Sequence, residues 1–290
     1  EPQPVPTDHG KRKMMAKDLL TDQTALPTAA GLDVRVIHLE RAAARRTLMA
    51  VECDRVGLCP SVWAAVDASD PTTADRLASL PDQGPWGPMH AHAKGCLLSH
   101  LDALQGFLAS GASHVLILED DVFLADDLSR WTVSLDWWPP DADVVKIERW
   151  RDDRLLVLLD RDTRHHAGRR LQRMHSRHAG TGGYMITRAA ATRLVAQTRR
   201  DLPVDHLLFN PLVSPFARDL LSYQVSPALV VQGNEPAPVH TTAVAKPPRP
   251  LTLILRRGLA ELRAVAALPL LLSRRATLTR IGWQSRVPLA

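Results

Sequence analysis

The chain has 290 residues, of which 45% are hydrophobic and 23% are charged. This length supports a large hydrophobic core without disulfides, and we expect one main domain. The longest apolar run near the C-terminus, residues 264–272, is far shorter than the roughly 20 residues of a transmembrane helix, so no membrane span is predicted.

The cysteines and the charges narrow the class of protein further. Cys53, Cys59 and Cys96 form neither an even disulfide framework nor a zinc-like spacing, which predicts a reduced, cytoplasmic protein. The net charge is +5, yet residues 246–290 hold nine basic residues and one acid, so the rest of the chain carries −3. The basic pI is therefore a property of the C-terminal tail and argues against a nucleic-acid-binding body.

The pattern before residue 114 predicts an arm followed by alternating strands and helices. Residues 1–31 begin Pro-rich and polar, which is typical of a disordered or extended arm. Strands are expected at 32–40 and 61–68, with a helix between them, and the prolines and glycines of 79–93 predict a loop. From Gly95 onward, leucines recur at helical spacing and predict one buried helix face, at Leu97, Leu101, Leu104 and Leu108.

Residues 114–121 carry the main functional signal. Four apolar residues, 115–118, predict a strand buried on both faces, and the run ends in Glu119, Asp120 and Asp121. On a strand Glu119 and Asp121 point together while Asp120 points away. Because the carboxyl ends of parallel strands form the ligand site of such sheets, we predict that Glu119 and Asp121 hold Mg²⁺ or Mn²⁺.

A helix cap is the simpler alternative for an acidic cluster after a strand. In that interpretation the acids serve only to start the next helix, with Asp126 or Asp127 as its N-cap. The two alternatives predict different surroundings for the carboxylates, a ligand site or a helix start.

Later segments complete an α/β pattern. Strands are expected at 143–148, 180–187 and 221–232, a helix after 187, a helical turn at 202–209, and loops or short edge strands at 149–180. Alternating strands and helices predict an α/β fold with a mostly parallel central sheet. The tail at 246–290 is basic and amphipathic, and two alternatives remain open: it lies along an anionic membrane surface, or it docks on the domain as a helix.

An ordered set of motifs between residues 33 and 235 resembles glycosyltransferase family 25, which includes lipopolysaccharide and collagen galactosyltransferases. The matching segments are VRVIHLERAAARR, AAVDASD, GCLLSHLDALQ, LILEDDV, GTGGYMITRAAATRLV, LPVDHLLF and PALVVQ. Several motifs in the same order are far more specific than any one of them.

The resemblance implies a single Rossmann-like, GT-A-like nucleotide-sugar-binding domain at 32–245. Its expected activity is inverting, metal-dependent transfer of a hexose, most simply galactose from a UDP-sugar, to a cell-envelope glycan such as lipopolysaccharide. Asp205 is the expected catalytic base, and Glu119 and Asp121 are the expected ligands of Mn²⁺ or Mg²⁺. Gln232 stands where collagen-modifying relatives have a histidine metal ligand, and His240 could substitute for it.

The resemblance also implies a set of donor-binding residues. They are His38, Leu39, Arg41, Arg45, Asp67, Lys94, Ser99, His100, Asp120, Gly182, Gly183 and Tyr184. Thr181 and Tyr184 would offer hydroxyls to a sugar, and Lys94 would meet the diphosphate.

This sequence departs from the family pattern at four places. His38 replaces the usual Asn, Glu40 the usual Asp, Ala93 a common Glu, and Gln232 the histidine of the collagen-modifying relatives. The changes at His38, Ala93 and Gln232 leave open a non-catalytic glycan- or nucleotide-binding domain, and the same acidic strand end would also serve a metal-dependent nucleotide-sugar hydrolase. The expected partners are a nucleotide-sugar, a glycan or lipid-linked glycan and, for the tail, an anionic membrane surface.

Overall fold

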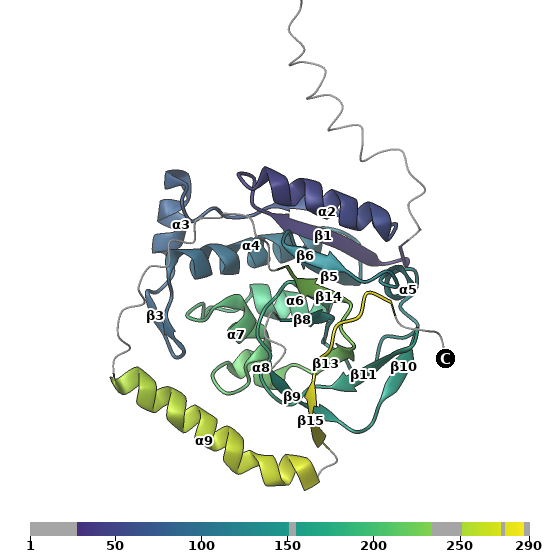
Figure 1. The fold of residues 1–290 in the computed structure, drawn as a ribbon. Helices are drawn as coiled ribbons and strands as arrows, with labels where there is room; N and C mark the ends of the chain where they lie inside the picture. The colour runs from purple at the N-terminus through teal and green to yellow at the C-terminus, as the bar shows by residue number, and fades with distance from the viewer. Residues whose placement is uncertain (1–27, 151–154, 234–250, 274–275, 287–290) are drawn as a thin grey trace, which may run out of the picture.

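The computed structural model describes residues 28–150, 155–233, 251–273 and 276–286 (Figure 1). Its centre is an eight-stranded sheet with the order β10-β11-β13-β7-β12-β5-β1-β2. These strands are β1 (Leu32–His38), β2 (Ser61–Ala64), β5 (His114–Glu119), β7 (Val144–Lys146), β10 (Arg164–His166), β11 (Arg169–Arg173), β12 (Gly183–Thr187) and β13 (Ser222–Ser226).

The sheet is mostly parallel, as the alternating pattern predicts. Strand β1 runs parallel to β2 and β5, and β7 runs parallel to β13. Strand β12 lies antiparallel between β5 and β7, and β11 is antiparallel to β10 and β13. All strands of this sheet except β11 and β12 therefore point in one direction, and the predicted α/β fold class is confirmed.

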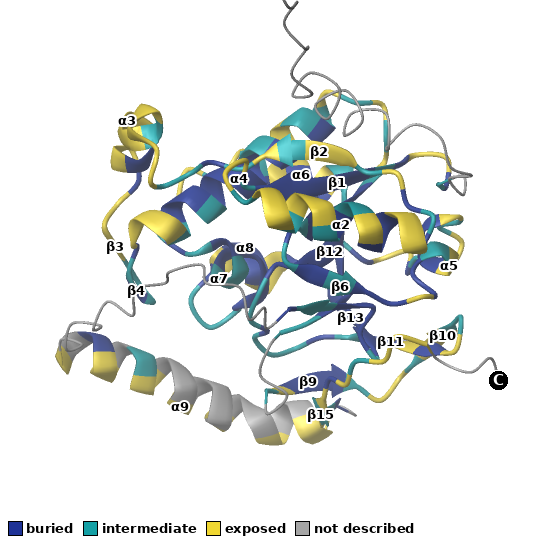
Figure 2. Cartoon of the chain, turned by 45° about the horizontal axis from the view of Figure 1, so that its top comes forward, coloured by how far each residue is buried: buried dark blue, intermediate teal, exposed yellow. Residues whose placement is uncertain are grey.

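Helices cover both faces of the sheet and form two cores. They are α2 (Ala43–Arg55), α4 (Ala91–Leu108), α6 (Arg188–Val195) and α7 (Val204–Phe209). One core joins the sheet to α4, α6 and α7, and the other contains residues of α2. Figure 1 shows α2 above β1 and α4 below it, and Figure 2 shows that the central strands β12 and β13 are buried.

The predicted buried face of α4 is confirmed. Leu97, Leu101 and Leu104 are buried in the core beneath the sheet, and Leu108, the fourth predicted position, is partly buried against it. The helix begins at Ala91, earlier than the expected start at Gly95, and the predicted loop before it contains the short hairpin of β3 (Gln83–Gly84) and β4 (Gly87–Pro88).

Strand β5 is buried on both faces, as its apolar run predicts. Val115 and Ile117 pack in the core with α4, whereas Leu116 and Leu118 pack in the core with α2. Because side chains alternate along a strand, this register decides on which face each following acid begins.

A small sheet adjoins the carboxyl ends of the central strands. Its order is β6-β14-β8, formed by β6 (Val122–Leu124), β8 (Glu148–Arg149) and β14 (Val230–Gln232). Each strand follows closely on a central strand, since β6 follows β5, β8 follows β7 and β14 follows β13. The expected strand 221–232 is thus two strands, because Pro227 between them has no N–H to donate to a ladder.

The prediction that Asp126 or Asp127 caps the next helix is wrong. Helix α5 (Ser129–Thr132) follows Leu128 and has no side-chain cap. Asp127 instead accepts hydrogen bonds from the buried guanidinium of Arg169 at 2.8 and 2.5 Å, and Asp126 pairs with Arg55. Ion pairing satisfies these carboxylates, so no helix start is needed to explain them.

Part of the predicted C-terminal tail packs against the domain. Strand β15 (Ala276–Arg280) pairs antiparallel with β9 (Leu156–Asp160), and the N–H of Ala228 donates to the carbonyl of Gly282. Helix α9 (Leu251–Ser273) precedes it, and Arg257 of α9 donates to the carbonyl of Trp86. The boundary at 245/246 stays a prediction, and residues 234–250, with His240, lie outside the described residues.

Among the residues described, no helix has the length and apolarity needed to span a bilayer.

The remaining elements are short: the 3₁₀ turn η1 (Pro71–Thr73), α3 (Ala74–Ala78) and α8 (Pro215–Asp219).

Candidate active site

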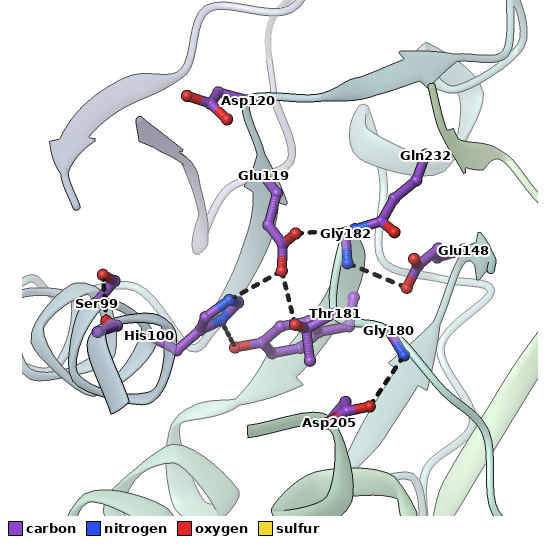
Figure 3. A network of polar contacts seen from close by, with 12 residues as sticks. Ser99, His100, Glu119, Asp120, Glu148, Gly180, Thr181, Gly182, Asp205 and Gln232 are labelled. Atoms are coloured by element: carbon purple, nitrogen blue, oxygen red, sulfur yellow. Dashed lines mark hydrogen bonds and ion pairs between the residues drawn. The ribbon is translucent and has the colours of Figure 1, made fainter. Parts of the chain in front are cut away.

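Glu119 is the last residue of β5 and the centre of a polar network (Figure 3). It lies on the same side of the strand as Ile117, which faces α4, and there it meets His100 of that helix. Its Oε1 accepts hydrogen bonds from the Thr181 hydroxyl at 2.6 Å and from His100 Nε2 at 3.2 Å. Its Oε2 accepts one from the Gln232 amide at 3.0 Å.

His100 connects Glu119 to Tyr184 of β12. Because an ionised carboxylate can only accept, the proton between His100 and Glu119 belongs to His100 Nε2. His100 Nδ1 lies 3.0 Å from the Tyr184 hydroxyl, and the two rings stack with centroids 5.7 Å apart. Both side chains are buried. Tyr184 therefore helps to hold the His100 ring, and His100 helps to hold the Glu119 carboxylate in one orientation.

The surroundings of Glu119 keep it ionised. Burial opposes ionisation, but the hydrogen bonds from His100 and Thr181 and the charge of Lys146 outweigh it and lower the pKa of Glu119 to about 2. Burial, and then the negative charges of Glu119, Asp205 and Asp121, raise the pKa of the nearby Cys96 thiol. Three acids from two segments of the chain therefore act on one small region, which favours a cation there.

Asp120 turns to the other face of the sheet and organises the end of β1. Its Oδ2 lies 2.8 Å from His38 Nδ1 and accepts from the backbone N–H of Leu39 at 3.0 Å. Its Oδ1 accepts from Arg45 of α2 at 3.2 Å. His38 Nε2 is buried without a hydrogen-bond partner among the described residues, which leaves one ring nitrogen for a ligand.

Arginines of the chain supply part of the positive charge that the acidic cluster requires. The Arg45 guanidinium reaches Asp120 and also lies 3.9 Å from the Asp121 carboxylate. Arg41 donates to Asp67 at 2.6 Å, and both belong to the predicted donor-binding set. That the side chains of Glu119 and Asp121 point the same way stays a prediction.

Two buried charges near the site were missed by the sequence analysis. Lys146, the last residue of β7, donates to Glu148 Oε2 at 2.7 Å, and Glu148 begins β8. Glu148 Oε2 also accepts from the backbone N–H of Gly182 at 3.0 Å. Burial and the charge of Glu119, opposed by Lys146, raise the pKa of Glu148 to about 7. Opposite charges two residues apart at the end of a buried strand were the signal that could have revealed this pair.

Asp205, the predicted base, lies in the first turn of α7 near the glycine-rich turn before β12. Its Oδ2 accepts a long hydrogen bond of 3.4 Å from the N–H of Gly180, and its Oδ1 accepts from the N–H of His206 at 2.8 Å. Figure 3 shows it across that turn from Glu119. Its role as a base stays a prediction.

Several predicted donor-binding residues have structural partners outside this network. Lys94 is buried and donates to the carbonyls of Leu77 and Leu80 and to Asp82. The Ser99 hydroxyl accepts from the N–H of Val66 at 2.8 Å, which fixes α4 beside the end of β2.

Neighbouring side chains explain why positions 182 and 183 are glycine. A Cβ at Gly182 would lie 3.0 Å from Val122, and one at Gly183 would lie 3.0 Å from Val230. Close packing of the backbone against the small sheet therefore favours glycine at both positions, independently of any ligand.

Two donor sets could be considered for a metal ion. Ligand atoms of Cys96, His100 and Glu119 lie within 4.8 Å of one another. Metals bind the thiolate, yet burial and the neighbouring acids raise the Cys96 pKa well above its usual value, and His100 already uses Nε2 on Glu119. The carboxylates of Glu119 and Asp121, with the Gln232 amide, are oxygen donors that suit Mg²⁺ or Mn²⁺ better.

The fold is an α/β domain with a mostly parallel central sheet and an acidic cluster at the end of its β5 strand. Residues 32–208 match the family described as glycosyltransferase family 25 (LPS biosynthesis protein), and the chain belongs to that family.

Curated relatives agree with the family match. The chain is 29% identical to the lipooligosaccharide biosynthesis protein lex-1 of Haemophilus influenzae, over 53% of this chain and 54% of that protein. It is 26% identical to the lacto-N-neotetraose biosynthesis glycosyltransferase LgtB of Neisseria gonorrhoeae, over 71% of this chain and 76% of that protein. The chain thus spans about half the length of the first of these relatives.

A solved glycosyltransferase involved in glycosylation of the PBCV-1 major capsid shares 12% identity with the chain. The match covers 71% of this chain and 96% of that one, with a TM-score of 0.36. So distant a likeness supports no statement about function.

Proposed function

We propose that the chain is an inverting, metal-dependent glycosyltransferase of cell-envelope glycan synthesis, which transfers galactose from UDP-galactose to a lipooligosaccharide-type acceptor. The single observation that carries this is Glu119 at the end of the central strand, where three hydrogen bonds hold its carboxylate inside the region that matches the family. The names of the relatives, which refer to lipooligosaccharide and lacto-N-neotetraose biosynthesis, support the acceptor class.

Glu119 and Asp121 would hold Mn²⁺ or Mg²⁺, with the Gln232 amide oxygen as a third donor. When bound, the ion neutralises the charge that develops on the diphosphate leaving group. In this structure the amide N–H of Gln232 donates to Glu119, so the amide group would have to turn over for its oxygen to face an ion held by that carboxylate. Three hydrogen bonds hold the Glu119 carboxylate, so it faces the proposed ion in one orientation.

The cluster around Asp120 is the proposed nucleoside site. Asp120 holds His38, the N–H of Leu39 and Arg45 at the end of β1, and the unpartnered His38 Nε2 can bond to a base or ribose. Arg45 would approach the phosphates, because it already reaches both Asp120 and Asp121.

Asp205 is the proposed base that takes the proton of the acceptor hydroxyl. Inversion in one displacement needs a single such group, and it must lie on the side of the sugar opposite the leaving diphosphate. The position of Asp205 supports this role, because the glycine-rich turn lies between it and Glu119.

The direct test follows nucleotide release with and without an acceptor. The full chain is incubated with UDP-galactose, Mn²⁺ and a lipooligosaccharide that lacks its terminal galactose, and both UDP and the extended glycan are measured. We expect release of UDP only when acceptor and metal are both present. Equal release without acceptor would identify a hydrolase instead, and glycan binding without any release would identify a binding domain.

Assays with other UDP-hexoses test the identity of the transferred sugar separately from the type of reaction. If UDP-galactose gives no product but another UDP-hexose does, the transferase assignment stands and the galactose assignment fails. Retention of the anomeric configuration in the product, measured by NMR, would contradict inversion.

The exposed side of α9 supports association with the inner surface of the cytoplasmic membrane. Its exposed apolar residues recur at i, i+3, i+4, i+8 and i+11 on one side of the helix, as Leu251, Ile254, Leu255, Leu259 and Leu262. Leu253 on the other side is buried. With nine basic residues against one acid in 246–290, this apolar side suits an anionic lipid surface, where a lipid-linked acceptor would be found.

A further inference from the structure

Lys146 and Glu148 form an ion pair that is completely buried beside the proposed catalytic site. Both side chains have 0% exposure. The ammonium group also lies over the Phe209 ring, 4.4 Å from its centroid. A pair of this kind gives little net stability, because desolvation offsets the attraction of the charges, so its position calls for another explanation.

The pair is bonded to both ends of the turn that precedes β12. Lys146 donates to the carbonyl of Gly180, and Glu148 accepts from the N–H of Gly182 at 3.0 Å. Gly180 has φ of +79°, and a Cβ there would lie 2.5 Å from Glu148 Oε1. The turn can therefore approach this close only with glycine at position 180.

The residue between these two contacts is Thr181, whose hydroxyl donates to Glu119 Oε1 at 2.6 Å. Figure 3 shows Glu148 on one side of the turn and Glu119 on the other. Held at residues 180 and 182, the turn has little freedom to carry the Thr181 hydroxyl away from Glu119.

We propose that Lys146 and Glu148 are positioning residues that act through Thr181: by fixing the turn at residues 180–182, they orient the Glu119 carboxylate before substrate binds. The effect on turnover rests on the proposed transferase function, whereas the effect on the turn does not. Neither residue needs to touch a substrate, which fits their complete burial.

The test is a double-mutant cycle between Glu148 and Thr181, measured on the full chain. Glu148→Gln keeps the shape of the side chain and removes its charge, and Thr181→Val removes the hydroxyl. We expect each single variant to lower kcat/KM about tenfold to a hundredfold, mainly through kcat. If Glu148 acts through Thr181, the double variant loses no more than Thr181→Val alone, whereas two independent effects would multiply.

A second readout does not depend on turnover. Hydrogen–deuterium exchange of the peptide that contains residues 180–183 should accelerate in Glu148→Gln. Gly180→Ala, whose Cβ would meet the Glu148 carboxylate and displace the same turn while both charged residues remain in the chain, should give the same acceleration and a similar loss of kcat. Unchanged exchange in a folded Glu148→Gln variant would overturn the proposal, even if the wild type showed no transferase activity at all.

Asp127→Asn is the matched control, because it breaks the similarly buried pair with Arg169, away from this turn. It should lower the melting temperature, leave exchange at 180–183 unchanged and combine multiplicatively with Thr181→Val. If Asp127→Asn also accelerated exchange at 180–183, the effect of Glu148 would be one of general stability, and the positioning role would be contradicted.

Discussion

Glu119 and Asp120 are adjacent in the chain, yet their carboxylates bind partners on opposite faces of the central sheet. Glu119 bonds to His100 of α4 on one face, and Asp120 bonds to Arg45 of α2 on the other. The alternation of side chains along β5 continues to Asp120, so the two carboxylates lie in different parts of the proposed site. One acid belongs to the proposed metal site, and its neighbour holds the proposed nucleoside site.

Asp121→Asn should abolish most turnover while leaving glycan affinity intact. Loss of one metal-binding carboxylate removes charge stabilisation from the leaving group, and we expect a fall in kcat of about a hundredfold to a thousandfold. Steady-state kinetics with UDP-galactose and a glycan-binding titration measure the two effects separately. Asp126→Asn is the matched control, because Asp126 pairs with Arg55 at the surface; an equal loss in that variant would argue against a specific role for Asp121.

Asp120→Asn should weaken nucleotide binding more than it weakens the fold. A UDP-sugar at 100 times its Kd stabilises a protein by about 2.7 kcal/mol, which corresponds to a rise of about 5–10 °C in melting temperature for a domain of this size. We expect a rise of this order in the wild type with Mn²⁺ and a much smaller one in Asp120→Asn. A full rise in the variant would show that the Asp120 cluster does not form the nucleoside site.

Glu119 should make the fold less stable in acid. Its pKa falls from 4.5 to about 2 in the folded protein, so its contribution is complete above about pH 5 and disappears as the pH falls toward 2. The shift corresponds to about 3 kcal/mol of unfolding free energy at neutral pH. In metal-free buffer, the stability difference between wild type and Glu119→Gln should be largest above pH 5 and should close toward pH 2. A difference independent of pH would contradict the network around Glu119.

Local pattern predicted much of the fold. The apolar run of β5 and the leucine spacing of α4 depend only on which side chains avoid water, and both elements formed with the expected buried faces. The reversed strand β12 could not be predicted in this way, because strand direction within a sheet is set by contacts distant in sequence. The sequence pattern also grouped β15 with the tail, since its pairing with β9 joins residues more than 100 positions apart.

In the candidate site, too, the residues with a local sequence signal were predicted and those that depend on distant contacts were not. Glu119 and Asp120 stand out because acids directly follow a buried strand, and their opposite orientations follow from strand geometry. Lys146 and Glu148 escaped notice because a lysine and a glutamate ordinarily imply an exposed surface. Only the structure reveals that Gly180 and Gly182 come close enough to satisfy them.

The apolar side of α9 gives a prediction about membranes. Replacing Leu255, Leu259 and Leu262 together by Gln should reduce binding to phosphatidylglycerol-containing vesicles at least tenfold without changing turnover on a soluble acceptor. About 25 cal/mol for each Å² of apolar surface withdrawn from water makes three leucines sufficient for such an effect. Sedimentation with vesicles measures it.

Leu278→Gln provides the control for that experiment. This residue is also an exposed leucine, but it lies on β15 rather than α9. Vesicle binding that survives the triple replacement, or that is lost equally in Leu278→Gln, would exclude α9 as the membrane-binding element.

The central claim is that the acids at the end of β5 hold a cation against a diphosphate. Its most direct test is electron paramagnetic resonance of Mn²⁺ titrated into the protein with UDP present. We expect the wild type to bind a single Mn²⁺ whose affinity rises when UDP is added, and Asp121→Asn to lose this site while Asp126→Asn keeps it. Equal Mn²⁺ binding in the wild type and Asp121→Asn, or no effect of UDP on the wild type, would contradict the claim.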